Sequence, residues 1–475
     1  MRTLLLILAA NSVFALPVSA QQAGATGENP RVIPVGTIVP KVVAIATPDQ
    51  SYAVYIPKSS SPTSRSPIIF AFDPGARGVR PVELMKDAAE HYGFIVVGSN
   101  NSRNGSWKVE AEAAQAMLQD TRRNFPPIDE RRIYFAGFSG GARVAVRLAQ
   151  ICKCVAGVLL NGAGFQPEAK ASQDAPFAVF AAVGTYDFNY GEIVRMDDDL
   201  ERLSYPHFFR RFDGPHQWAP ASVMEEALAW FRLQAMKSGR ESREDSFIAT
   251  MAAQETERAQ AFEQSGDGYA AWKEYRQAAE AFAEVTDNSS FRSRAETLEK
   301  DKAVRESAKR EKQEFEEQDQ MTREISSGLS MLKENQPNRA DIPRDVGQRV
   351  VDLRNRAAHE KREEKLRVLK RALAGVMVQA MEMGFDRLEQ KDAGRARQYF
   401  ELACDADPDS VWAVSNLAVA KVMDGDRKGA LESLRRAKSK TKDLDQFIAW
   451  LNEEPAFVKL HGTPEFAAIL ALPEH

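Results

Sequence analysis

The chain has 475 residues, of which 44% are hydrophobic and 27% charged, and its formal net charge is −4. At about 100–200 residues per domain, this length predicts two to four domains. The apolar fraction is that of an ordinary globular protein. Because the charge is nearly balanced, the chain lacks the strong basic excess typical of nucleic-acid binding, and we expect no such partner.

The first 20 residues have the pattern of a secretory signal peptide. Arg2 supplies the positive end, Leu4–Ala10 form an apolar run, and Val18-Ser19-Ala20 is a small-residue cleavage site. The alternative is an uncleaved membrane anchor, but the run is shorter than the roughly 20 apolar residues that span a bilayer. We therefore expect export, to a periplasm or out of the cell, with no membrane span afterwards. Residues 21–40 should be a flexible lead-in.

The chain has three cysteines, Cys152, Cys154 and Cys404. An odd number in an exported protein leaves at least one thiol unpaired or in an intermolecular bond. The close spacing of Cys152 and Cys154 suits no common zinc site, so we expect either small buried residues or a local redox pair. No metal-ligand spacing, P-loop or dinucleotide motif is present, and no metal or cofactor is expected.

Between residues 41 and 236, apolar runs typical of strands alternate with helical patterns. Strands are expected at 41–45, 52–57, 68–72, 94–97, 133–136, 155–160, 177–183 and 208–212, and helices at 81–91, 109–124, 142–150 and 221–234. Continuous apolar runs fit central strands that are covered on both faces. The alternation predicts an α/β domain with a doubly wound, mostly parallel sheet.

Beyond residue 237, strand-like runs cease and charged residues follow helical spacing. We expect residues 237–370 to form a charged helical region, with a helix–helix turn at Gln264–Gly268 and a break around Pro337 and Pro343. The block 352–371 carries dense charge of both signs. It predicts a solvated helix with many i,i+4 ion pairs.

In residues 371–475 a pattern recurs at a spacing of 34 residues. Gly384, Ala396, Phe400 and Ala403 recur as Ala418, Ala430, Leu434 and Ala437. Small residues at fixed positions let antiparallel helices approach closely, and the large residue fills the gap. The pattern resembles the tetratricopeptide repeat and predicts an all-α helical repeat domain with a cap near 455–472. The segment 261–282 is a candidate degenerate repeat, and such helices predict a protein or peptide partner.

The pentapeptide Gly137-Phe138-Ser139-Gly140-Gly141 follows one expected strand and precedes an expected helix. A nucleophilic serine on such a sharp turn stands above the strand ends, and the glycines remove Cβ clashes from a strained backbone. The N–H of Gly140, at the helix start, can donate to a developing oxyanion. The alternative is a glycine-rich turn that carries an ordinary serine.

Two later residues follow strands at the same edge of the expected sheet. Asp187 comes just after strand 177–183, and His216 follows strand 208–212. Catalytic groups of such sheets gather beyond the carboxyl ends of the strands, and Ser–Asp–His is the chain order of this fold. These positions predict a catalytic triad of Ser139, Asp187 and His216.

Other residues are weaker candidates for the acid and the base. The acidic run Asp197–Asp199 is expected to lie in solvent, and Asp213 is too close to His216 in the loop. His207 precedes the last strand and should lie at its far end. Trp107, Trp218 and Phe138 are expected to line a substrate pocket, although the two tryptophans equally suit a core position.

These residues resemble the α/β-hydrolase superfamily over residues 42–232, and more narrowly secreted esterases related to polyhydroxyalkanoate depolymerases and dienelactone hydrolases. The resemblance implies that Ser139 is the nucleophile, that His216 is general base and then acid, and that Asp187 orients the imidazole. It implies hydrolysis of a small or polymeric carboxylic ester through an acyl-enzyme. A peptidase would differ only in its pocket, and an inactive scaffold would not need the three residues together.

The loop after strand 68–72 departs from that family, which usually has His-Gly there. Here the loop begins Asp73-Pro74-Gly75. Because Pro74 has no N–H, the second oxyanion donor is expected from Gly75 or Ala76. Asp73 would disfavour an oxyanion unless it is turned away or paired, for instance with Arg77 or Arg143.

Overall fold

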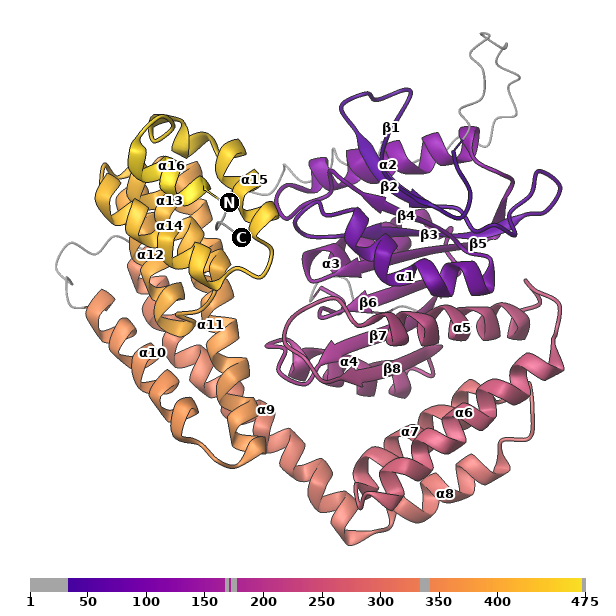
Figure 1. Ribbon diagram of the computed structural model, residues 1–475. Coiled ribbons are helices and arrows are strands. Elements are labelled where there is room, and N and C mark those ends of the chain that lie inside the picture. The colour runs from indigo at the N-terminus through magenta and orange to yellow at the C-terminus, as the bar shows by residue number, and fades with distance from the viewer. Residues whose placement is uncertain (1–32, 167–170, 172–176, 334–341, 472–475) are drawn as a thin grey trace, which may run out of the picture. The chain divides into compact units, whose positions relative to one another are not determined.

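The computed structural model describes residues 33–166, 171, 177–333 and 342–471 (Figure 1). The expected signal peptide, most of the lead-in and Pro337 lie outside these described residues. The chain divides into two compact units: residues up to Thr185 with Asn189–Ser307 form one, and Tyr186–Phe188 with Ala308–His475 form the other. Within the described ranges, no helix combines the length and apolar character that a membrane span needs.

The first unit is built on an eight-stranded sheet with the order β1-β2-β4-β3-β5-β6-β7-β8. Its strands are β1 (Ile38–Val43), β2 (Ser51–Tyr55), β3 (Ser66–Phe72), β4 (Ile95–Ser99), β5 (Ile128–Phe138), β6 (Gly157–Asn161), β7 (Ala178–Gly184) and β8 (His207–Phe212). β2 pairs antiparallel with β1 and β4, and the remaining pairs are parallel. This is the expected doubly wound α/β-hydrolase sheet, and all eight expected strands are confirmed.

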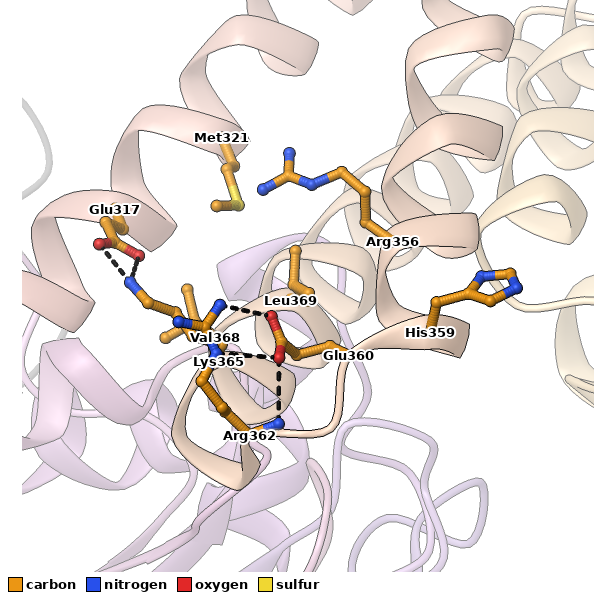
Figure 2. A pocket seen from close by; sticks show the side chains of 9 residues that line it. All are labelled: Glu317, Met321, Arg356, His359, Glu360, Arg362, Lys365, Val368 and Leu369. Atoms are coloured by element: carbon orange, nitrogen blue, oxygen red, sulfur yellow. Dashed lines mark hydrogen bonds and ion pairs between the residues drawn. The ribbon is translucent and has the colours of Figure 1, made fainter.

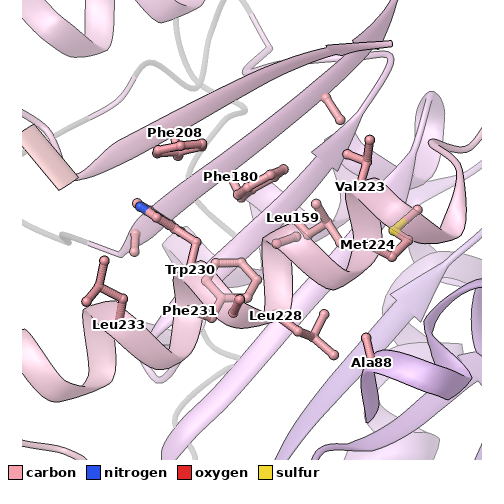
Figure 3. Close-up of a cluster of buried hydrophobic side chains, with 14 of the residues drawn as sticks. Ala88, Leu159, Phe180, Phe208, Val223, Met224, Leu228, Trp230, Phe231 and Leu233 are labelled. Carbon is pink, nitrogen blue, oxygen red and sulfur yellow. The ribbon is translucent and has the colours of Figure 1, made fainter. Parts of the chain in front are cut away.

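Five helices cover the sheet: α1 (Val79–Tyr92), α2 (Trp107–Asn124), α3 (Gly140–Cys152), α4 (Tyr190–Arg202) and α5 (Ala221–Lys237). α1 and α5 pack together on one face, and α2, α3 and α4 cover the other (Figure 1). Figure 3 shows the first of these faces, where Phe180 and Phe208 of the strands meet Trp230 and Phe231 of α5. Full burial of such a side chain contributes about 1.5–3 kcal/mol, so this face contributes strongly to the stability of the unit.

Three further helices belong to the first unit: α6 (Asp245–Gln264), α7 (Gly268–Ala281) and α8 (Ser289–Glu299). The turn expected at Gln264–Gly268 is confirmed between α6 and α7. This division keeps α6–α8 with the sheet, while the domain boundary expected at residue 236 stays a prediction. The candidate degenerate repeat 261–282 therefore belongs to the unit that carries the sheet.

Buried polar contacts attach these helices to the edge strand β8. The N–H of Phe209 donates to Oε1 of Gln277 at 2.7 Å. Arg210 is 2% exposed and forms ion pairs with one glutamate from each of α5, α6 and α7, namely Glu226, Glu255 and Glu274. Buried charges need such partners, so Arg210 of β8 and the three helices depend on each other.

The second unit is helical. It contains α9 (Lys302–Lys333) from Ala308 onward, and then α10 (Ile342–His359), α11 (Glu363–Glu389), α12 (Ala393–Ala406), α13 (Val411–Met423), α14 (Arg427–Lys440), α15 (Leu444–Glu453), a 3-10 turn (Pro455–Lys459) and α16 (Pro464–Leu470). The residues of the 34-residue pattern other than Gly384 are buried at less than 1% exposure. A Cβ at Gly384 would lie 2.7 Å from Cζ of Phe400, so the small residue permits close packing of α11 and α12.

A second feature of these helices follows the same spacing. Asp392 caps the start of α12, where its side chain accepts from the N–H of Arg395. Asp426 caps the start of α14 in the same way and accepts from the N–H of Gly429. Such side-chain caps stabilise a helix start by about 1 kcal/mol. The two aspartates are 34 residues apart in the chain, a match that the apolar pattern did not include.

The expectation of one solvated helix over 352–371 is wrong. α10 ends at His359 and α11 begins at Glu363. The described ion pairs of α11 in this block reach α9, with Lys365 2.5 Å from Glu317 and Arg371 3.8 Å from Glu314. Leu353, Val368 and Leu369 are buried. Because these apolar residues pack between the helices, the neighbouring charged side chains of α11 form their ion pairs with α9.

Candidate active site

Ser139 lies on a strained turn between β5 and α3. Its backbone has φ 53° and ψ −123°, and α3 begins at the next residue. Its N–H donates to the carbonyl oxygen of Asn161, at the end of β6, at 2.9 Å. A Cβ at Gly137 or Gly141 would collide with neighbouring backbone atoms. This conformation costs energy and persists only where its surroundings enforce it, and it is that of a nucleophile elbow.

His216 lies in the loop between β8 and α5, beside the elbow. The centre of its ring is 4.6 Å from the centre of the Phe138 ring, and Phe138 directly precedes Ser139 in the chain. The Trp218 ring lies 5.8 Å from Phe138 on the same side. The structure therefore brings the loop that carries His216 to the elbow, at the carboxyl ends of the parallel strands.

Asp187 follows the end of β7 and is completely buried. It belongs to the segment Tyr186–Phe188, which groups with the helices of the second unit. In that unit the carbonyl oxygen of Phe188 accepts from Nε2 of Gln318 at 2.7 Å, and the Lys370 ammonium lies 4.9 Å from the centre of the Tyr186 ring. The role of Asp187 stays a prediction, and it has to be tested in the full chain.

The competing acid and base lie elsewhere. His207 begins β8, at the end of the strand away from the elbow, as expected. The expectation that Asp197 is solvated is wrong, because it is 1% exposed and its Oδ1 lies 3.2 Å from Nε2 of His207. Arg276 adds a second cation 3.6 Å from Asp197. α4 turns this carboxylate toward the sheet, so its charge is neutralised by buried partners.

The buried carboxylate of Asp73 is neutralised inside the β3–α1 loop. Its Oδ1 accepts from Nε of Arg77 at 2.9 Å, and its Oδ2 accepts from Nη2 of Arg77 at 3.0 Å and from Nε1 of Trp218 at 2.7 Å. The expected pairing with Arg77 is confirmed. Arg143 instead pairs with Glu192 at 2.7 Å. Asp73 is thus a fixed acceptor that holds Trp218 in place.

The same loop uses the N–H groups that were expected to bind an oxyanion. The N–H of Gly75 donates to Oδ1 of Asp73 at 2.8 Å, and the N–H of Ala76 donates to the Asp73 carbonyl oxygen at 3.1 Å. A backbone N–H with a good acceptor gains little from exchanging it for another. In this conformation neither residue offers an unused donor, because the side chain of Asp73 accepts from Gly75 and its carbonyl oxygen accepts from Ala76.

Sequence reasoning missed Asn104, in the loop between β4 and α2. This loop pairs with the β3–α1 loop through the Asn104 N–H, which donates to the Pro74 carbonyl oxygen at 3.0 Å, and through a bridge between Gly75 and Arg103. The carboxamide of Asn104 occupies the space that a side chain at Gly140 would fill. Gly140 leaves the space that this carboxamide fills, but which side chain fills it is set by tertiary structure.

The aromatic residues expected to line a pocket have unequal surroundings. Phe138 and Trp218 are only 6% and 5% exposed, so they mainly support the His216 loop. Trp107, at the start of α2, is half-buried, and the Arg147 guanidinium lies 3.8 Å from its ring centre. On the next turn of α2, burial raises the pKa of Glu110 to about 7, and the charge of Arg147 opposes this. Their role in binding substrate stays a prediction.

A separate cavity of about 590 Å³ lies within the helical unit, between α9, α10 and α11 (Figure 2). Its walls carry two ion pairs, Glu317 with Lys365 and Glu360 with Arg362. Apolar side chains also line it, namely Met321, Val368 and Leu369. The residues described as lining it include no serine, threonine or cysteine.

The cysteines take two states. Cys152 and Cys154 form a disulfide at the end of α3, with their Cα atoms 5.0 Å apart. Cys404 is a buried free thiol, and burial raises its pKa to about 11. Across the described residues, no group of three or more His, Cys, Asp or Glu side chains is arranged to hold a metal ion.

Solved structures that are similar to part of this chain include several hydrolases and esterases. An S-formylglutathione hydrolase from Staphylococcus aureus has 15% identity and a TM-score of 0.34, over 42% of this chain and 99% of its own. A feruloyl esterase module from Clostridium thermocellum has 17% identity and a TM-score of 0.32, over 41% of this chain and 86% of its own. Esterase 2 from Thermogutta terrifontis has 12% identity and a TM-score of 0.35, over 43% and 96%.

No protein-family model matches this chain, and no curated protein sequence matches it. The fold assignment rests on the strand order and on the turn at Ser139, and not on these distant similarities.

Proposed function

We propose that this protein is an exported serine hydrolase that cleaves carboxylic esters. The observation that carries the proposal is Ser139, held at positive φ between a parallel strand and a helix, with the His216 loop against the preceding residue. A serine in this strained position serves little structural purpose, but its hydroxyl stands clear of the sheet for attack on a carbonyl.

In the proposed mechanism Ser139 Oγ attacks the ester carbonyl carbon while His216 takes the serine proton. The imidazolium then gives that proton to the departing alcohol, which leaves an acyl-serine. Water attacks the acyl group in turn, with His216 again as the base, and the carboxylic acid leaves. Asp187 is proposed to orient the imidazole, and the N–H of Gly140 is proposed to donate to the oxyanion at the positive end of α3.

The surroundings of the elbow support a neutral ester as substrate. The nearby Asp73 carboxylate is paired with Arg77 and Trp218, so it presents no uncompensated negative charge to the oxyanion. Export is supported by the Cys152–Cys154 disulfide, since disulfides persist in oxidising compartments. The helices α11–α14, with their 34-residue spacing, are proposed to be tetratricopeptide-like and to bind a protein or peptide partner.

The first prediction tests the nucleophile. Ser139→Ala should lower the turnover of short p-nitrophenyl esters by about 10³-fold or more, because the acyl-enzyme can no longer form. A fluorophosphonate probe should label the wild-type chain at Ser139 and leave the variant unlabelled. Ser106→Ala, which removes an exposed hydroxyl on a nearby loop, is the matched control and should keep full labelling.

A scaffold without catalysis is the competing function. The Gly75 and Ala76 N–H groups favour it, because both already have acceptors within their loop. Unlabelled, folded wild-type protein with no turnover of any ester in a panel would support the scaffold. Turnover of amides but not of esters would instead support a peptidase on the same fold.

A further inference from the structure

The hydrolase proposed above needs two donors for the carbonyl oxygen as it gains negative charge. One is available at Gly140, where α3 begins. The β3–α1 loop does not supply the second from the expected residues, since Pro74 has no N–H and those of Gly75 and Ala76 are already used. A second donor therefore has to come from another element that reaches the elbow.

The β4–α2 loop reaches the elbow with a side-chain amide. A Cβ placed on Gly140 would collide with Oδ1 of Asn104, and would lie 2.9 Å from its Cγ and 3.3 Å from its Nδ2. The carboxamide therefore lies directly against the residue that follows the nucleophile. The backbone of Asn104 is fixed in this position, because its N–H donates to Pro74 and the adjacent Arg103 bridges to Gly75.

The donors and the acceptor of the Asn104 carboxamide are also unused. Among the described residues it has no hydrogen-bond partner, and the side chain is exposed. An amide offers two N–H donors. Rotation about the last torsion of asparagine exchanges Oδ1 and Nδ2 at little cost, because that torsion is broad. An N–H of Asn104 can thus turn toward an oxygen bound at the elbow without disturbing another contact.

We propose that Nδ2 of Asn104 is the second oxyanion donor, acting beside the N–H of Gly140; this rests on the function proposed above. As Ser139 Oγ bonds to the carbonyl carbon, the electron pair of the C=O π bond moves to the oxygen and the serine proton passes to His216. The oxyanion then accepts from Gly140 and from Asn104. Both bonds strengthen as charge develops, so Asn104 acts on the rate of the chemical step rather than on substrate binding.

The residue after the nucleophile is glycine because the carboxamide fills the space of its side chain. Gly140→Ala keeps the backbone N–H but has to displace Asn104. It should therefore lower kcat in the wild-type background and add little in an Asn104→Ala background. Such non-additivity is the sign of two residues that act through one contact.

Kinetics of p-nitrophenyl butyrate hydrolysis by the full chain test the proposal. Asn104→Ala and the isosteric Asn104→Asp should each lower kcat by about 10²–10³-fold, as loss of an oxyanion donor does, while KM stays within about threefold of wild type. Ser106→Ala, on the same loop, is the matched control and should retain wild-type rates. Thermal unfolding of each variant shows whether a rate change reflects lost structure.

The outcomes separate this proposal from the function on which it rests. If Ser139→Ala abolishes turnover but both Asn104 variants keep kcat within about threefold of wild type, Asn104 is not a donor and the hydrolase stands. A rise in KM with unchanged kcat would equally overturn the proposal, since it indicates substrate binding alone. If Ser139→Ala keeps wild-type turnover, the proposed function fails and the role of Asn104 fails with it.

Discussion

Strand β8 has a histidine near each end, and the two have opposite surroundings. His207 begins the strand, is buried, and lies 3.2 Å from the carboxylate of Asp197. His216 follows the strand in a loop, is half-exposed, and packs on the residue before Ser139. At about 3.3 Å per residue, the ends of this strand lie roughly 17–20 Å apart.

A histidine and an aspartate at ion-pair distance therefore do not by themselves identify a catalytic site. His207 has a carboxylate at ion-pair distance, but it lies at the amino end of β8, where parallel sheets rarely carry active sites. His216 lies at the carboxyl end, beside the elbow. Strand direction, which a sequence conveys only through the fold, decides which of the two histidines lies beside Ser139.

Exchange of His216 for glutamine should lower activity more than any other change considered below, and the same exchange at His207 is its control. His216→Gln should lower kcat/KM for a p-nitrophenyl ester by about 10³-fold or more, because the base for both steps is lost. His207→Gln should leave the kcat/KM of the folded protein within about threefold of wild type. Steady-state kinetics corrected for the folded fraction separates the two. Equal losses in both variants would show that the two ends of β8 are coupled in catalysis.

The middle of the same strand offers a test of stability. Arg210→Met should lower the free energy of unfolding by about 3–5 kcal/mol, because Glu226, Glu255 and Glu274 lose the cation they surround. Urea unfolding followed by circular dichroism measures the loss. Arg305→Met removes an exposed guanidinium on α9 and should change the free energy by less than about 0.5 kcal/mol. A stable Arg210→Met would mean that packing alone holds α6 and α7 to the sheet.

The smallest expected effect is a pH dependence of stability from the His207–Asp197 pair. Burial alone would lower the pKa of His207, but Asp197 and Glu280 raise it above the usual 6.5. Burial alone would raise the pKa of Asp197, but His207, Arg276 and Lys273 lower it below 3.8. The histidine contribution is complete below pH 6.5 and is lost as pH rises through the raised pKa; the aspartate contribution is complete above pH 3.8 and is lost as pH falls.

Unfolding measured between pH 3 and 9 checks this dependence against the His207→Gln variant. The wild-type protein should lose more stability than the variant as pH rises above 6.5. Parallel profiles for the two proteins would show that His207 titrates in the folded state as it does in the unfolded chain.

Much of the fold follows from local pattern. The eight strands are short apolar runs with clear boundaries, so the alternation with helices was enough to predict the sheet. The positions of Ser139 and His216 at one end of it followed from strand order. Charge density suggested a solvated helical region beyond residue 236, and the boundary there stays a prediction. The charges of α6 and α7 instead meet Arg210, an interaction between residues far apart in the chain.

Several contacts at the site could not be predicted from the sequence, because they too join residues that are far apart in the chain. Nothing local indicates that the Asp73 side chain takes the N–H of Gly75, or that Asn104 lies against Gly140. Both depend on how three loops from neighbouring strands meet. The buried state of Asp197 was missed because an acidic run resembles a solvated surface until a histidine and an arginine are placed opposite it.

The contact between Phe209 and Gln277 protects the outer edge of the sheet. β8 is the last strand of the sheet, and its outer backbone donor at Phe209 is satisfied by a side chain of α7. A fragment that ends at Lys237 would expose this strand edge to other chains, and exposed edges recruit further strands into aggregates. A chain that keeps α6–α8 keeps this strand edge covered.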